Sequence, residues 1–142
     1  MDLQKTIELL LKQARHIAEG HDMVLDFSDE SIQGVSELLD FYHESYLEAG
    51  ENIIKEQPDT FAHIWGVYVG EILRRNYGPS WAWEKAEYGL VLAKNEKNMI
   101  NPVGKAHKHI VNGKEDGDDI GGFFSVAILF LQDKFPSGNT PN

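Results

Sequence analysis

The chain has 142 residues, the usual length of one domain, and its 42% hydrophobic and 25% charged residues are typical of a globular protein. Because it contains no cysteine, disulfides, cysteine metal sites and thiol nucleophiles are excluded. The net charge of −10 lies in residues 1–60, which hold 14 acidic and four basic residues, whereas 61–142 hold nine of each. This charge argues against nucleic acid as a partner and favours either a basic partner or no charged partner at all.

The sequence shows neither the pattern of a signal peptide nor an apolar run of membrane-spanning length. The N-terminal residues do not form a basic start followed by an apolar block, so we expect no signal peptide. The longest apolar run, 123–131 with one serine, is too short to span a bilayer. We therefore expect a cytoplasmic protein with no membrane contact.

The first two helices are predicted from apolar residues at helical spacing. Residues 3–18 form the first such pattern, and Gly20 is expected to end it. After a short apolar connector over 23–27, Ser28 is the expected N-cap of a second helix. The apolar stripe of this helix continues until Gly50 interrupts it.

The third helix is predicted to be the buried centre of the fold. Pro58 is expected to end the second segment, and Asp59 or Thr60 to cap a helix over 61–77. The residues of this helix are apolar nearly all round, which predicts a buried helix.

Two glycines in this helix, Gly66 and Gly70, predict a close contact with another element. Each costs a helix about 1 kcal/mol relative to alanine, and close packing is the usual compensation. They lie four residues apart, so together with Ala62 they form one smooth stripe.

The hydrophobic period then changes. Short aromatic and β-branched segments with polar gaps predict two or three antiparallel strands between about residues 81 and 101. Pro102 is expected to begin a fourth helix, since proline suits the first helical position, and Asn112 with Gly113 to end it.

The C-terminal part is predicted to hold one more helix. A hydrophilic turn over 115–119 precedes an apolar helix over about 120–135, and 136–142 form a flexible tail. The sequence therefore predicts one α+β domain over 1–135, mainly helical, with a small antiparallel sheet inserted between the third and fourth helices.

One pattern resembles a family of small uncharacterised bacterial domains. Its motif is G-x-Y-x-G-E-x-x-R, a short gap, then G-x-x-W, and it falls here on Gly66, Tyr68, Gly70, Glu71, Arg74, Gly78 and Trp81. A second segment matches at Pro102, Lys105, Asn112, Gly113 and Asp116. The resemblance covers about residues 60–125 and implies no catalysis. Related domains are reported among bacterial toxin-neutralising genes, so it implies a binding role.

Two interpretations of Glu71, Arg74 and Arg75 are open. On a helix the acid reaches both arginines, at i+3 and i+4. The arginines could form a fork for a carboxylate or phosphate, with Trp81 in the same pocket. Alternatively, the arginines neutralise a buried glutamate and hold the helix in place. A pocket with convergent polar groups beside Trp81 and Trp83 would favour the first interpretation.

No metal site, cofactor or catalytic residue is predicted. His107 and His109 are two residues apart on a helix and point to different faces, so they cannot share a metal. The acidic run over 115–119 lacks the glutamate of a calcium-binding loop, because the twelfth residue from Asp116 is Ala127. Signatures of hydrolases, nucleotide-binding loops and zinc proteases are missing.

An acidic stripe on the second helix predicts a partner surface. No lysine or arginine occurs between Asp22 and Ile54, although solvated faces usually mix both signs. The stripe lies on one side of the helix and consists of Glu37, Asp40, Glu44, Glu48 and Glu51. A plain solvated face is the alternative.

Two functions of different classes follow. The first is a non-catalytic binding module, similar to an immunity protein, whose acidic helix covers a basic protein. The second is a small ligand-binding protein or hydrolase with Glu71, Arg74 and Trp81 in a pocket. The sequence leaves the oligomeric state open.

Overall fold

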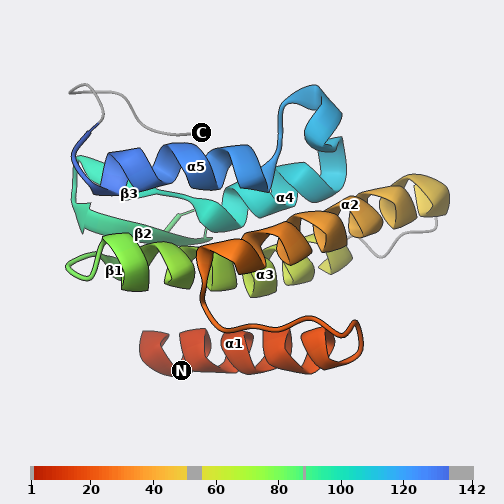
Figure 1. Ribbon diagram of the computed structural model, residues 1–142, viewed down its shortest axis with the longest axis horizontal. Coiled ribbons are helices and arrows are strands. Elements are labelled where there is room, and N and C mark those ends of the chain that lie inside the picture. The colour runs from red at the N-terminus through yellow and green to blue at the C-terminus, as the bar shows by residue number, and fades with distance from the viewer. Residues whose placement is uncertain (1, 51–55, 88, 135–142) are drawn as a thin grey trace.

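The computed structural model describes residues 2–50, 56–87 and 89–134. Figure 1 shows the helices surrounding a central α3, with a small sheet at one end. The expected tail, 136–142, and Glu51 of the acidic stripe lie outside the described residues. The elements are α1 Leu3–Glu19, η1 Asp29–Ser31, α2 Ile32–Ala49, α3 Glu56–Tyr77, β1 Ala82–Ala86, β2 Gly89–Asn95, β3 Asn98–Ile100, α4 Pro102–Asn112, η3 Lys114–Asp116 and α5 Ile120–Leu131.

The predicted fold class is confirmed, because the three strands lie between α3 and α4 in an otherwise helical chain. They form an antiparallel sheet in the order β1-β2-β3. In its register Trp83 pairs with Leu92, and Leu92 pairs with Ile100. β2 is the most buried strand and lies against α4, whereas the outer residues of β1 face solvent.

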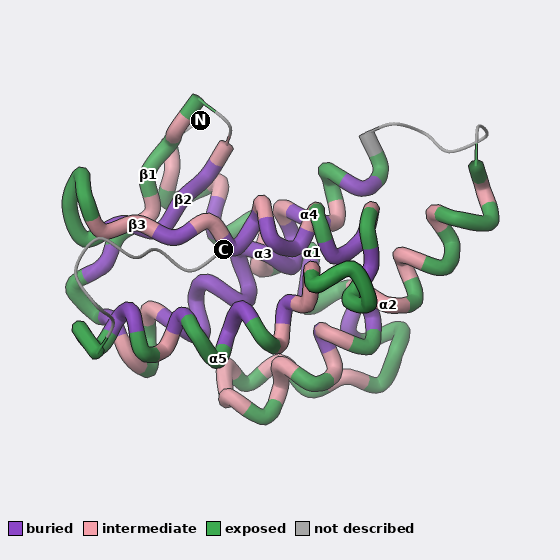
Figure 2. Tube along the Cα trace, turned by 90° about the horizontal axis from the view of Figure 1, so that it is seen from above, coloured by how far each residue is buried: buried purple, intermediate pink, exposed green. Residues whose placement is uncertain are grey.

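The core follows α3, as its apolar composition predicts. Figure 2 shows an almost continuous buried stretch along this helix and α4. Trp65, Tyr68 and Leu73 of α3 are among the most buried side chains. α1 covers one side of α3, and α4 and α5 cover the opposite side (Figure 1). None of the helices in the described ranges combines the length and apolarity needed to cross a bilayer.

The close contact predicted from Gly66 and Gly70 is confirmed. A Cβ atom at Gly66 would lie 2.4 Å from the Cα of Val103, and one at Gly70 would lie 2.3 Å from the Trp83 ring and 3.1 Å from Pro102. The first turn of α4 therefore crosses α3 at backbone distance. This contact offsets the helix propensity that two glycines lose.

The predicted starts of α4 and α5 are confirmed, and side-chain caps explain them. Pro102 occupies the first turn of α4, and Asn101 accepts a hydrogen bond from the backbone N–H of Gly104. Asp119, the last residue of the predicted turn, accepts one from the N–H of Gly121 and so caps α5.

Two predicted boundaries of helices are wrong. Pro58 does not end the second segment, because α3 begins at Glu56 and holds this proline in its first turn, where its missing N–H costs no hydrogen bond. α5 ends at Leu131 and not near residue 135. Asp133 takes the left-handed conformation there, with φ at 57°, and its N–H bonds the carbonyl of Phe130, an arrangement that ends a helix.

The predicted cap of the second helix is also corrected. Ser28 precedes the short turn η1, and α2 begins after it at Ile32. The hydroxyl of Ser28 donates to Asp26 instead of capping a helix. The connector over 20–28 contains no strand in the structure.

Candidate functional site

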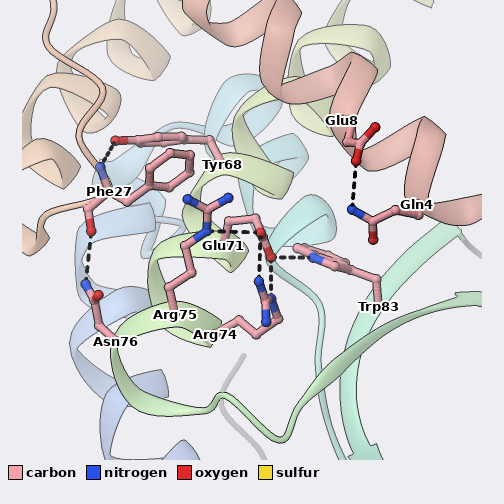
Figure 3. A network of polar contacts seen from close by, with 9 residues as sticks. All are labelled: Gln4, Glu8, Phe27, Tyr68, Glu71, Arg74, Arg75, Asn76 and Trp83. Carbon is pink, nitrogen blue, oxygen red and sulfur yellow. Dashed lines mark hydrogen bonds and ion pairs between the residues drawn. The ribbon is translucent and has the colours of Figure 1, made fainter.

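Glu71 lies at the centre of a cluster of polar groups that the sequence predicted in part. The residue is 4% exposed, and its two carboxylate oxygens accept four hydrogen bonds. Arg74 donates two, at 2.7 and 3.2 Å, and Arg75 donates one at 3.2 Å. In Figure 3, Arg75 approaches the carboxylate from one side, and the indole of Trp83 approaches it from the opposite side. The predicted ion pairs are therefore present with both arginines.

The groups around Glu71 keep its carboxyl ionised and engage both of its oxygens in hydrogen bonds. Burial acts to raise the pKa of the carboxyl, but the hydrogen bonds from Arg74 and Trp83 and the two guanidinium charges outweigh it, so the pKa is lowered. A general acid or base needs an available proton or lone pair at working pH. Each carboxylate oxygen of Glu71 already accepts two hydrogen bonds, so this geometry favours a structural ion pair over acid–base chemistry.

Trp83, not Trp81, completes the cluster. Its indole N–H donates to Glu71 over 2.9 Å, because the β1 strand turns this residue toward α3. Trp81 is buried one residue before the strand and packs edge-on against Phe130 of α5. The signal for Trp83 was present in the sequence, since on a strand it faces the side opposite to its charged neighbour Glu84, which is exposed.

A pocket of about 350 Å³ lies beside this cluster. It contains the side chain of Arg74 and both tryptophans, as the first interpretation of the cluster requires. The N-terminal turn of α1 forms the opposite wall. The lining residues are Leu3, Gln4, Ile7, Glu71, Arg74, Trp81, Ala82 and Trp83.

On the other side of the cluster, α3 holds the connector that precedes α2. The guanidinium of Arg75 lies 3.7 Å from the centroid of the Phe27 ring, a cation–π contact. Phe27 has a left-handed backbone, with φ at 59°, and its N–H donates to the hydroxyl of Tyr68. Asn76 donates to the carbonyl of Phe27, so both backbone groups of this strained residue are bonded (Figure 3).

The side chain of Asp40 is 30% exposed, but its bonds within the fold set it apart from the free acidic stripe. Its Oδ1 lies 2.7 Å from Nε2 of His109, which is fully buried, and its Oδ2 lies 3.2 Å from Nζ of Lys114. Burial acts to raise the pKa of Asp40, but the bonds from His109 and Lys114 dominate and lower it. The backbone N–H of Ile120 donates to Nδ1 of His109, so the imidazole joins α2, α4 and α5. Sequence reasoning missed this role, because the two partners are far apart in the chain.

The remaining described members of the predicted stripe, Glu37, Glu44 and Glu48, are exposed on one side of α2. Phe41 lies between them at helical spacing and is 54% exposed. From residue 40 to 49 no residue of α2 is buried, and Figure 2 shows this half of the helix extending away from the buried centre. Leu47, in the same half, is 62% exposed.

The connector adds further carboxylates to this side of the molecule. A groove of about 430 Å³ is lined by Asp22, Asp26, Glu30 and Glu37, together with His21, Met23, Val24, Ser28, Ser31 and Gly34. The ring of His21 lies 6.4 Å from that of Phe41, which brings the connector next to the exposed half of α2. Val24 is 74% exposed at the edge of the groove.

The second segment of the resemblance has structural roles. Lys105 is buried and pairs with Asp118 over 3.2 Å, and Asn112 donates to the same carboxylate. Gly113 has φ at 87° and lies against the His43 ring, where a side chain would collide. These contacts fix the turn between α4 and α5. Within the described ranges no three histidine or acidic side chains converge as metal ligands.

Comparison with protein-family models, curated proteins and solved structures finds no match for this chain. The resemblance of its motif to the bacterial family therefore stays an expectation. The proposals that follow rest on geometry and charge.

Proposed function

We propose that this protein is a non-catalytic binding module, similar to an immunity protein, that covers a basic surface of another protein. The binding surface is the acidic face, which consists of Glu37, Phe41, Glu44 and Glu48 on α2, Asp22, Val24 and Asp26 on the connector, and Glu30 on η1.

The observation that carries the proposal is the position of Phe41. A solvated helix face needs no aromatic residue, yet Phe41 is half-exposed among three glutamates. Protein interfaces combine a few aromatic anchors with a charged rim, and the anchors supply most of the affinity. Phe41 fits the role of an aromatic anchor, Val24 adds apolar surface beside it, and the carboxylates fit the rim.

The charge of the acidic face indicates the class of partner. No lysine or arginine lies between residues 16 and 54. The carboxylates of the face outnumber the cations that reach this side from other elements, Lys114 at Asp40 and Arg75 at Phe27, so its field is negative. Such a field attracts a positive surface and accelerates encounter. A nuclease toxin is the kind of partner that fits best, because its substrate groove must be positive to hold a phosphate backbone. The protein would act by covering that groove.

The experiment starts with affinity capture from the native host, followed by purification of the retained protein and measurement of direct binding. Three variants are compared with the parent: Phe41→Ala, the triple variant Glu37→Gln/Glu44→Gln/Glu48→Gln, and a matched control, Glu84→Gln/Glu87→Gln/Glu96→Gln, which removes the same charge from exposed residues around the sheet. We expect Phe41→Ala to increase the dissociation rate and the first triple variant to slow association, with little effect of the control.

Two results would contradict the proposal. One is that the captured protein associates with the α2 triple variant as fast as with the parent at low salt. The other is equal slowing by both triple variants, which would mean that only total charge matters. Circular dichroism of each variant shows whether the helices are retained.

A further inference from the structure

The pocket between α1 and β1 has a feature that the acidic face lacks, an available guanidinium edge. Arg74 uses Nε and Nη2 to bind Glu71. Within the part of the chain that the structure describes, its Nη1 has no acceptor, and no buried side-chain nitrogen is left unsatisfied, so this edge is open to solvent. Arg74 lines the pocket, and its side chain is 31% exposed.

The cluster around this pocket carries an excess of positive charge. Glu71 is the one acidic partner that the described residues give to Arg74 and Arg75, so one carboxylate faces two guanidinium groups. Because the pKa of Glu71 is lowered, its carboxyl is ionised and contributes one negative charge. Among the residues that line the pocket, Arg74 and Glu71 balance in charge, so the feature that the pocket offers an anion is the free guanidinium edge of Arg74 and not a net positive charge.

The walls and the size of the pocket indicate which kind of ligand it could bind. Trp81, Trp83, Leu3 and Ile7 provide apolar surface, and Arg74 and Gln4 provide polar atoms. Ligand sites of this kind are mostly apolar, contain a few placed polar groups, and begin at about 300 Å³, which the pocket of about 350 Å³ reaches. A guanidinium edge matches the two oxygens of a carboxylate.

We propose that this pocket binds a small carboxylic acid, with its carboxylate on the free edge of Arg74 and its apolar body against the two tryptophans. The site shares no lining residue with the groove of the acidic face, so it does not depend on the protein partner proposed above. Glu71 has a positioning role here, because its two bonds fix the guanidinium plane.

The test uses benzoate as the probe and benzamide as its neutral counterpart. Binding is followed by NMR through the three indole N–H signals. Trp81 and Trp83 line the pocket, whereas Trp65 is buried in the core and serves as an internal reference. We expect benzoate to shift the signals of Trp81 and Trp83 in a saturable way at concentrations up to about 10 mM, a weak affinity that suits a small probe. Benzamide is expected to leave them unchanged.

Three variants assign the binding to Arg74. Arg74→Gln should weaken benzoate binding by about tenfold or more, the usual worth of a charged hydrogen bond. Arg75→Gln removes the same charge from the same glutamate but lies outside the pocket lining, so it should keep most of the affinity. Ala82→Phe places a ring at an exposed strand position that lines the pocket and should block binding without disturbing the fold.

The proposal is overturned if benzamide shifts the signals as benzoate does, or if neither probe affects Trp81 and Trp83. Equal losses in Arg74→Gln and Arg75→Gln would also overturn it, because they would indicate a general charge effect. If Arg74→Gln does not fold, Ala82→Phe decides: unchanged benzoate affinity in that variant would place the probe outside this pocket.

Discussion

Nε2 of His109 and Oδ1 of Asp40 lie 2.7 Å apart, and this bond joins the last turn of α4 to the middle of α2. Because Nδ1 accepts the N–H of Ile120, the proton of the neutral ring lies on Nε2 and is donated to the carboxylate. This bond gives Asp40 a role within the fold that the other acidic residues of the predicted stripe do not have. Asp40 is thus expected to affect stability, and Glu44, one helical turn further on, to affect binding.

Replacement of Asp40 by alanine should lower the free energy of unfolding by about 1–3 kcal/mol, because it leaves the buried N–H of His109 without an acceptor. Asp40→Asn keeps an acceptor and should cost less. Urea denaturation followed by circular dichroism measures both variants. Glu44→Ala, at an exposed position of the same helix, is the control and should stay within about 0.5 kcal/mol of the parent. Equal stability of Asp40→Ala and Glu44→Ala would show that the bond to His109 contributes nothing.

Replacement of Glu71 by glutamine should destabilise the fold in a pH-dependent way. We expect a cost of about 1–3 kcal/mol at pH 7, less than the 3–5 of a fully buried pair, because both guanidinium groups are partly exposed. The folded-state pKa of Glu71 is lowered, so its contribution to stability is complete above the unfolded pKa of about 4.3 and is lost as the pH falls through the folded value.

Unfolding free energies of the parent and Glu71→Gln should therefore differ by a constant amount from about pH 7 to about pH 5 and converge in more acidic solution. Denaturant titrations at several pH values measure this difference. A gap that stays constant down to pH 3 would mean that the ionised carboxylate is not the stabilising group. The structural interpretation of the ion pair would then fail.

Two glycine-to-alanine variants should have opposite effects. Gly66→Ala should destabilise the protein by about 1–3 kcal/mol, since the new Cβ would lie 2.4 Å from the backbone of Val103, which cannot move aside. Gly34→Ala on α2 would meet only the end of the Met23 side chain, at 3.3 Å, so the gain in helix propensity should prevail and stabilise by up to about 1 kcal/mol. Thermal melting of both variants measures the contrast, and a stabilising Gly66→Ala would refute the close crossing of α3 and α4.

The α2 triple variant, Glu37→Gln/Glu44→Gln/Glu48→Gln, should be slightly more stable than the parent. Glu44 is four residues from both Asp40 and Glu48, and like charges at this spacing cost a few tenths of a kcal/mol per pair. The gain should fade in 1 M salt, where the screening length is about 3 Å. Melting at low and high salt measures it. Glu37 accepts an exposed hydrogen bond from Gln33, and a glutamine at position 37 keeps an acceptor for it. A loss of stability would show that these glutamates have stabilising partners beyond this one, which would weaken their assignment to a binding surface.

The sequence predicted the features that depend on local backbone chemistry. Pro102 and Gly50 mark helix ends because their conformations restrict what can follow or precede them. The pair of Glu71 with its two arginines could also be predicted, because all three belong to one helix. The error at Pro58 has the same local origin, since proline is compatible both with the end of one helix and with the first turn of the next.

Contacts between distant segments were not predictable from one sequence. His109 was weighed only as a metal ligand, and its bond to Asp40 crosses from one helix to another. The same holds for Phe27, whose left-handed backbone depends on Tyr68 and Asn76 of α3. No local pattern favours that conformation for a phenylalanine, because it is stabilised by the groups around it.

The anchoring of the connector on α3 has a consequence for the thermodynamics of recognition. Both backbone groups of Phe27 are bonded, Arg75 covers its ring, and Asp29 accepts hydrogen bonds from Asn76 and Tyr77. The carboxylates that flank Phe27 in the chain are therefore placed before any partner arrives. Binding to a preformed surface avoids the entropy loss of ordering a loop, so one of the costs of association is removed and the affinity is higher by that amount. Association should then resemble the docking of two rigid bodies, with little change in heat capacity beyond that of the buried apolar area.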